Sequence, residues 1–206
     1  MTNPQQLLKQ CVSRDDFGDL LNSLGLTGEG VEIGVYEGDY SEILLSKWNG
    51  SKLHLVDPWR ELDDYRDGMN APTGICDERL RRTISRLEPF GNRFEIHRRK
   101  SSEAAEEFKS ESLDFVYIDG NHDFQHVSED IRLWFPKLRK GGLLAGHDYC
   151  DEVNDYYECG VKSAVTEFLT HGDFTLYLTN DGIIGQVSAT AGQRSLSDRG
   201  TVCYNN

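Results

Sequence analysis

Two polar segments of the chain, YIDGNHDFQHV and AGHDY, carry residue types that catalytic and metal sites use. Each segment follows an apolar run that predicts a strand. A tight turn after a strand needs only Asp-Gly, so both segments contain more polar residues than a turn requires. If the two strands are neighbours, Asp119, His147 and Asp148 face one cavity and could hold a divalent cation. His122 could then remove a proton from a bound hydroxyl, because an imidazole titrates near neutral pH. Alternatively, Asp119 and Asp148 cap the following helices and His122 is a surface residue.

A glycine-containing loop, EIGVYEGDYS, indicates a second kind of chemistry, the binding of a nucleoside. Gly34 and Gly38 would let the backbone approach a ligand closely, although their spacing is not that of the dinucleotide motif. Asp57 ends a strand-like run about 20 residues later, where a carboxylate could accept both hydroxyls of a ribose. A tight turn and an Asp-Pro cap would explain the same residues. Together, the loop and Asp57 favour an adenosine-containing ligand.

The elements that must position these residues alternate between strand and helix patterns. Five strand-like runs are separated by segments of helical spacing, at 31–36, 52–56, 93–97, 113–118 and 142–147. The alternation predicts an α/β, Rossmann-like, doubly wound sheet, mostly parallel, with helices on both faces. Two further runs, 174–178 and 183–187, flank the turn signal Asn180-Asp181-Gly182, so one of them should be antiparallel. In such sheets ligands bind beyond the carboxyl ends of the strands.

The chain is expected to comprise a helical segment at 1–28, a main domain at 29–187 and a polar, loosely ordered tail at 188–206. Its 206 residues suit one core, and its net charge of −13 argues against nucleic-acid binding, which depends on Lys and Arg. Neither a membrane-spanning run nor a signal-peptide pattern is visible. We therefore expect a cytoplasmic protein without a membrane or nucleic-acid partner, and we consider a homodimer through the N-terminal helices.

Other conspicuous residues have ordinary structural explanations. The five cysteines form no CxxC pair, which predicts free thiols. His54 should be a hydrogen-bonded core residue, whereas His97 has no motif around it. His126 should belong to a helix that Asp123 caps, and Trp59 could either lie beside an adenine or cover the sheet edge.

Three segments taken in order resemble the motifs of class I S-adenosylmethionine-dependent methyltransferases: EIGVYEGDYS, LHLVDPW and DFVYIDGNHDFQHVSEDIRLWFPKLRKGGLLAGHDY. The likeness covers about residues 28–187. It is closest to a group of small-molecule O-methyltransferases that includes macrolide-sugar enzymes of the macrocin and mycinamicin type. The resemblance implies a seven-stranded sheet with an antiparallel last strand. It also implies methyl transfer from S-adenosylmethionine to a hydroxyl of a small molecule, such as a sugar or polyol.

The resemblance also implies roles for individual residues. The cofactor would contact Glu32, Gly34, Tyr36, Gly38, Asp57, Trp59, Ser101, Ser102 and Asp119, with one of the two serines near the adenine. His122 would be the catalytic base beside Asp119, and Asp119, His147 and Asp148 would hold magnesium or manganese. His147 stands where magnesium enzymes usually have a carboxylate, and an imidazole is a softer ligand. The site could therefore take manganese, hold magnesium through the two carboxylates, or hold no metal.

Two other functions remain compatible with the sequence. The protein could be a non-catalytic binding protein for S-adenosylmethionine or another adenosine ligand, or a different enzyme on the same scaffold, because a fold does not define a reaction. The acidic segments 60–75 and 149–160 are expected to roof the site, which favours a neutral polar or cationic acceptor.

Overall fold

The computed structural model describes residues 4–8, 10–63, 65, 69–153, 158–172, 174–179, 186–188 and 201–205. Its helices are α1 (Pro4–Leu8), η1 (Arg14–Asp16), α2 (Phe17–Ser23), α3 (Asp39–Lys47), α4 (Thr73–Leu87), η2 (Glu88–Arg93), α5 (Ser101–Ala105), α6 (Phe124–Trp134), η3 (Phe135–Lys137) and α7 (Val161–Leu169). Its strands are β1 (Glu29–Ile33), β2 (Lys52–Asp57), β3 (Phe94–Arg98), β4 (Leu113–Ile118), β5 (Leu138–Gly146), β6 (Asp151–Val153), β7 (Glu158–Gly160), β8 (Thr175–Thr179), β9 (Gln186–Ser188) and β10 (Thr201–Asn205).

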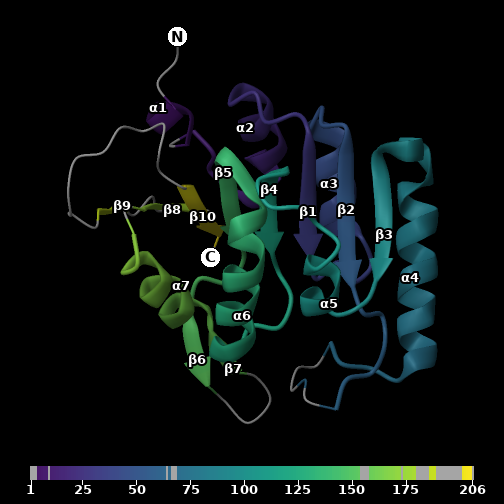
Figure 1. The fold of residues 1–206 in the computed structure, drawn as a ribbon. Coiled ribbons are helices and arrows are strands. Elements are labelled where there is room, and N and C mark those ends of the chain that lie inside the picture. Colours follow the sequence, from purple (N-terminus) through teal and green to yellow (C-terminus); the bar gives the residue numbers. More distant parts are fainter. Residues whose placement is uncertain are drawn as a thin grey trace.

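A mostly parallel sheet forms the centre of the molecule, with the strand order β3-β2-β1-β4-β5-β10-β8-β9 (Figure 1). β1 pairs in parallel with β2 and with β4, and β4 pairs in parallel with β5. The carboxyl ends of these strands therefore meet at one edge of the sheet. β6 and β7 form a separate antiparallel pair after β5. The predicted α/β, Rossmann-like architecture is confirmed.

The far side of the sheet differs from the expected seven strands with an antiparallel last strand. Eight strands pair within the described residues, and the antiparallel strand is β9 at the edge. The last strand, β10, is parallel and lies between β5 and β8. A domain boundary at residue 187 therefore leaves out a strand, because the short run TVCYN is difficult to recognise within a polar segment. The predicted turn at 180–182 lies outside the described residues.

Hydrophobic side chains cover both faces of the sheet, since alternate residues of a strand point to opposite sides. Leu53 and Phe115 pack in the layer that includes α2, α3 and α4, whereas Val56 and Val116 pack in the layer that includes α5, α6 and α7. Figure 1 shows α6 and α7 on the face opposite α2 and α3. Within the described parts of the chain, no helix combines the length and apolarity that crossing a membrane requires.

Candidate active site

A cavity of about 510 Å³ opens at the carboxyl ends of β1, β2 and β4. Its volume falls within the range of about 300–1,000 Å³ that is typical of small-molecule sites. The predicted cofactor-site residues in its wall are Glu32, Gly34, Tyr36, Asp57, Trp59, Ser101, Ser102 and Asp119. Gly38 is not among the described residues of the wall; it precedes α3 with a φ of +77° instead.

Four side chains meet where β4 and β5 end, and we call Asp119, His122, His147 and Asp148 the strand-end cluster. His122 Nε2 lies 3.1 Å from Asp148 Oδ2 and 3.4 Å from Asp119 Oδ1. His147 Nδ1 lies 3.1 Å from Asp148 Oδ1 and 3.8 Å from Asp119 Oδ1. The hydrogen bond with His147 lowers the pKa of Asp148. The structure thus brings together the residues that the two sequence motifs supply.

The alternative explanation for this cluster, helix capping, is wrong. α6 is capped by Asp123, whose Oδ1 accepts a hydrogen bond from the backbone N–H of His126 at 2.9 Å, as the sequence predicted. α7 begins after Gly160 rather than at Asp148. The side chain of His122 is only 14% exposed, so it is not a surface residue.

The strand-end cluster contains the donor atoms that a divalent cation would need. Asp119, His147 and Asp148 each offer one ligand atom, and these atoms lie within 4.8 Å of one another. One imidazole and two carboxylates suit manganese or another transition metal better than magnesium. His147 and Asp148 are absent from the described wall of the cavity, whereas Asp119 and His122 belong to it.

Arg14 reaches the same cluster from η1, and no pattern in the sequence indicated this contact. Its Nη1 lies 3.4 Å from Asp119 Oδ2, and its guanidinium lies 4.9 Å from the ring centroid of Tyr40. A positive charge at this position opposes the binding of a cation by Asp119. It also offers Asp119 a partner when no metal is bound. The contact joins residues 105 positions apart, so no local pattern could predict it.

Gly34 allows the loops after β1 and β4 to touch. Its φ is +83°, and a Cβ atom at this position would lie 2.1 Å from the carbonyl oxygen of Asp119. A side chain is therefore excluded both by backbone conformation and by space. Where the same two strands end, the backbone N–H of Asp119 donates to the carbonyl of Ile33 at 2.7 Å. The close approach places Asp119 directly against the glycine loop.

Asp57 fastens this loop to the end of β2. Its Oδ2 accepts hydrogen bonds from the backbone N–H groups of Val35 and Tyr36 at 3.0 and 3.1 Å. Its Oδ1 accepts one from the N–H of Trp59 at 2.7 Å, so the Asp-Pro turn is also present. Burial raises the pKa of Asp57, and these backbone donors oppose the shift. Because a carboxylate has about four acceptor positions, these three bonds do not preclude a hydrogen bond to a ribose hydroxyl.

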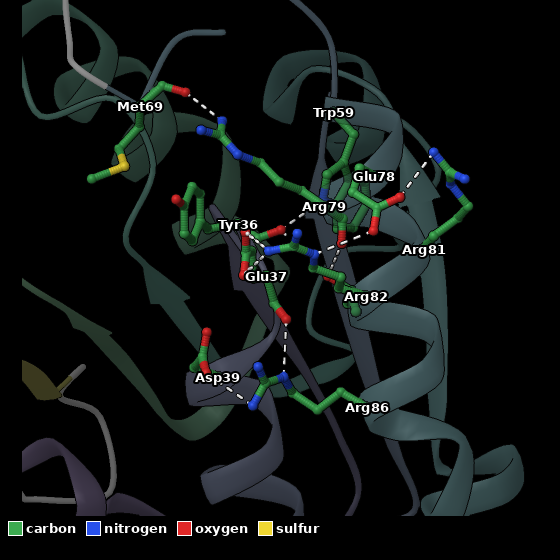
Figure 2. Close-up of polar contacts among 11 residues, drawn as sticks. Tyr36, Glu37, Asp39, Trp59, Met69, Glu78, Arg79, Arg81, Arg82 and Arg86 are labelled. Carbon is green, nitrogen blue, oxygen red and sulfur yellow. Dashed lines mark hydrogen bonds and ion pairs between the residues drawn. The ribbon is translucent and has the colours of Figure 1, made fainter. Parts of the chain in front are cut away.

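The rim of the cavity is fastened to α4 (Figure 2). The indole of Trp59 is 2% exposed and donates to the carbonyl of Tyr36 at 2.9 Å. The guanidinium of Arg79 lies 4.5 Å from the ring centroid of Tyr36 and donates to the carbonyl of Met69 at 2.5 Å. Arg82 and Arg86, also on α4, form ion pairs with acidic residues in or just after the glycine loop, namely Glu37, Asp39 and Glu42. Arg79 thus joins the glycine loop to the segment that precedes α4.

Ser101 and Ser102, which both line the cavity, differ in their hydrogen bonds. The hydroxyl of Ser101 accepts from the indole of Trp134 at 2.7 Å and donates to Asp130. Burial raises the pKa of Asp130 to about 7. Within the described residues, the hydroxyl of Ser102 makes no hydrogen bond, and the residue lines the cavity. Ser102 is therefore the better placed of the two to contact a ligand.

Glu32 is part of the cavity wall, and its carboxyl group accepts a hydrogen bond from α3. It is 1% exposed, and the hydroxyl of Ser41 donates to its Oε2 at 2.6 Å. Burial raises the pKa of Glu32 to about 8, and the nearby carboxylates of Asp119 and Asp57 contribute in the same direction. Glu32 is thus mainly protonated at neutral pH and links β1 to α3.

Comparison with known proteins places this chain in a family. A family model described as a methyltransferase domain matches residues 31–149. The uncharacterized protein R132 of Acanthamoeba polyphaga mimivirus is 24% identical over 129 residues, which are 59% of this chain and 51% of the relative. The chain spans about half the length of this curated relative.

Two solved structures share the fold. A protein from Corynebacterium glutamicum has a TM-score of 0.55 at 14% identity, over 85% of this chain and 84% of its own. An O-methyltransferase from Bacillus cereus, solved in complex with SAH, has a TM-score of 0.52 at 16% identity, over 83% of this chain and 70% of its own. The chain belongs to the methyltransferase-domain family, and its fold is that of a class I S-adenosylmethionine-dependent methyltransferase.

Proposed function

We propose that this protein transfers a methyl group from S-adenosylmethionine to a hydroxyl of a small molecule, such as a sugar or polyol. The observation that supports this most is the position of His122. It stands in the cavity wall with a carboxylate oxygen on either side, at 3.1 and 3.4 Å from its Nε2. The likeness to macrolide-sugar O-methyltransferases favours a hydroxyl acceptor.

The remaining walls fit the cofactor that the family uses. The glycine loop, Asp57 and Ser102 would hold its methionine, ribose and adenine parts in that order along the cavity. When bound, S-adenosylmethionine supplies an electrophilic methyl group: the acceptor oxygen forms the O–C bond while the C–S bond breaks, leaving S-adenosylhomocysteine.

The protein must align the acceptor and take up one proton. For His122 to act as the base, its neutral ring must carry its proton on Nδ1, because a ring that donates from Nε2 to an ionised carboxylate has no lone pair there. An acceptor hydroxyl that replaces Asp119 and Asp148 as the partner of Nε2 would then donate its proton to this nitrogen. Asp148 Oδ2, 3.1 Å away, would stabilise the imidazolium that forms. Asp119, His147 and Asp148 could also hold a divalent cation, which would supply Lewis-acid polarisation of the hydroxyl.

Binding and turnover provide separate tests of this proposal. Excess S-adenosylmethionine or S-adenosylhomocysteine should raise the melting temperature, because a ligand of the native state stabilises it by mass action. A panel of sugars, polyols and phenols should then include an acceptor that yields S-adenosylhomocysteine and a methyl ether. Absence of any melting shift would exclude the cofactor. A shift without turnover on the whole panel would favour a non-catalytic binding protein.

A further inference from the structure

A second group of histidines and carboxylates lies on the face of the sheet that α5 and α6 cover, and we call it the sheet-face cluster. It consists of Glu29 on β1, His54 on β2, Glu95 and His97 on β3, and Glu107 after α5. His54 Nδ1 lies 3.0 Å from His97 Nε2, and the two histidines are 8% and 9% exposed. None of the five residues belongs to the described wall of the cavity.

The outward-facing ring nitrogens determine how the two imidazoles must be protonated. His54 Nε2 lies 3.2 Å from Glu29 Oε2, and His97 Nδ1 lies 3.2 Å from Glu107 Oε2. An ionised carboxylate only accepts hydrogen bonds, so both of these nitrogens carry a proton. In neutral rings the inner nitrogens, His54 Nδ1 and His97 Nε2, then present lone pairs to each other. Two lone pairs at 3.0 Å repel, unless a cation lies between or beside them.

A third donor stands next to this pair. Glu95 Oε1 lies 3.9 Å from His97 Nε2, while its Oε2 lies 3.6 Å from the ammonium of Lys52. One ligand atom from each of His54, Glu95 and His97 lies within 4.8 Å of the other two. Bonds of about 2.1 Å in a tetrahedral zinc site place ligand atoms about 3.4 Å apart. The buried nitrogens already approach that spacing, and the half-exposed Glu95 can rotate to complete it.

We propose that His54, His97 and Glu95 form a binding site for zinc or a similar divalent transition metal. Glu29 and Glu107 complete the arrangement, because metal-bound histidines usually donate their second N–H to a carboxylate. Two imidazoles and one carboxylate suit zinc and leave a fourth position for water. The site is separate from the strand-end cluster and would join β2 to β3.

Aromatic contacts connect the sheet-face cluster to the end of the cavity at Ser101. The ring of Phe108 lies 4.9 Å from that of His54 and 5.4 Å from that of His97, between centroids. Phe108 also lies 5.1 Å from Trp134, whose indole donates to Ser101. A metal held by the two histidines would therefore stabilise the end of the cavity at Ser101, without contacting a ligand there.

Zinc binding can be measured in the full chain after treatment with a chelator. Zinc chloride would be titrated calorimetrically into a His147→Gln variant, which lacks an imidazole ligand in the strand-end cluster. We expect one zinc per chain. Adding His54→Gln should abolish this binding. Adding either Glu95→Gln or Glu29→Gln should weaken zinc binding about 10- to 100-fold. The Glu95→Gln variant should fold normally, because Glu95 is exposed. His171→Gln, on an exposed helix end, is the matched control and should change nothing. Equal affinity in all these variants would overturn the proposal.

An experiment on the unsubstituted chain does not depend on how the variants fold. Crystals grown with excess zinc should show an anomalous difference peak at the zinc edge, within bonding distance of His54 Nδ1 and His97 Nε2. Absence of a peak there, with zinc bound elsewhere, would overturn the metal site. The two histidines would then share a single proton.

Discussion

The strand-end cluster and the sheet-face cluster contain similar residue types in different surroundings. Both have two histidines within hydrogen-bond distance of carboxylates, and both have three ligand atoms within 4.8 Å. The first is built on loops beyond β4 and β5 and includes two residues of the cavity wall. The second is built mainly on the strands themselves, against Phe108. Position relative to the strand ends therefore decides whether such a cluster can meet a substrate.

The two clusters should respond differently to the loss of a histidine. His122→Ala should lower kcat about 10²- to 10⁴-fold, the usual contribution of a general base. His97→Ala should lower the free energy of unfolding by about 2 kcal/mol, because it leaves buried polar partners unsatisfied, and should lower kcat far less. The measurements are release of S-adenosylhomocysteine and urea unfolding. A similar loss of kcat in both variants would remove the distinction between the clusters.

The strand-end cluster also depends on a backbone contact that the sheet-face cluster lacks. Gly34→Ala should destabilise the protein by about 3 kcal/mol, because of its positive φ and the overlap with the Asp119 carbonyl. Gly120→Ala is the matched control, since its Cβ would meet Ile33 at ordinary van der Waals distances, 3.6 Å from Cγ2 and 4.0 Å from the carbonyl oxygen. It should cost less than about 1 kcal/mol. Equal unfolding free energies for the two variants would contradict the role assigned to Gly34.

The buried acid behind the strand-end cluster should make stability depend on pH. The folded-state pKa of Glu32 is raised from 4.5 to about 8, so its contribution to stability is complete below pH 4.5 and lost as the pH rises through about 8. The free energy of unfolding should fall by about 1.4 kcal/mol for each pH unit across this window. Glu32→Gln should reduce the slope, and the exposed Glu88→Gln should not. Asp130, with a pKa raised to about 7, contributes a slope of the same sign in every variant.

The smallest expected effect concerns the rim of the cavity. Arg79→Gln removes the cation–π contact with Tyr36 and the bond to Met69, and should weaken binding of S-adenosylhomocysteine about 2- to 5-fold. Arg81 is the matched control, because its side chain is 70% exposed and pairs with Glu78 on the same helix. Arg81→Gln should leave the affinity unchanged in the same calorimetric titration. Parallel losses in both variants would indicate a general effect of charge on α4 rather than a contact at the rim.

The sequence predicted those parts of the fold and site that local patterns carry. Alternating strand and helix patterns predicted the parallel sheet, and the polar ends of two apolar runs predicted the meeting of His122 with Asp148. Trp59 lines the cavity, and its place beside an adenine stays a prediction. His54 is a buried histidine within hydrogen-bond distance of Glu29, as expected of a core residue.

Contacts that depend on register or docking were not predictable in this way. His97 lies beside His54 only because β3 pairs with β2 in a register that aligns His97 with Val56. Arg14 meets Asp119 only after η1 has docked on the sheet. The engagement of Ser101 by Trp134 and Asp130 likewise depends on how α6 packs. None of these features leaves a periodic or motif-like trace in the sequence.

The place of β10 also affects the order in which the sheet can be completed. β10 lies between β5 and β8, although β8 precedes it in the chain. Residues 175–179 precede their neighbour at 201–205 in the chain, so β8 can form before the strand that separates it from β5 is in place. Until then, β5 and β8 each present an unpaired edge, which is the feature of β-proteins that most readily recruits other chains. The sheet is therefore complete only when residues 201–205 insert between β5 and β8, whereas β1, β2, β3 and β4 can already pair without them.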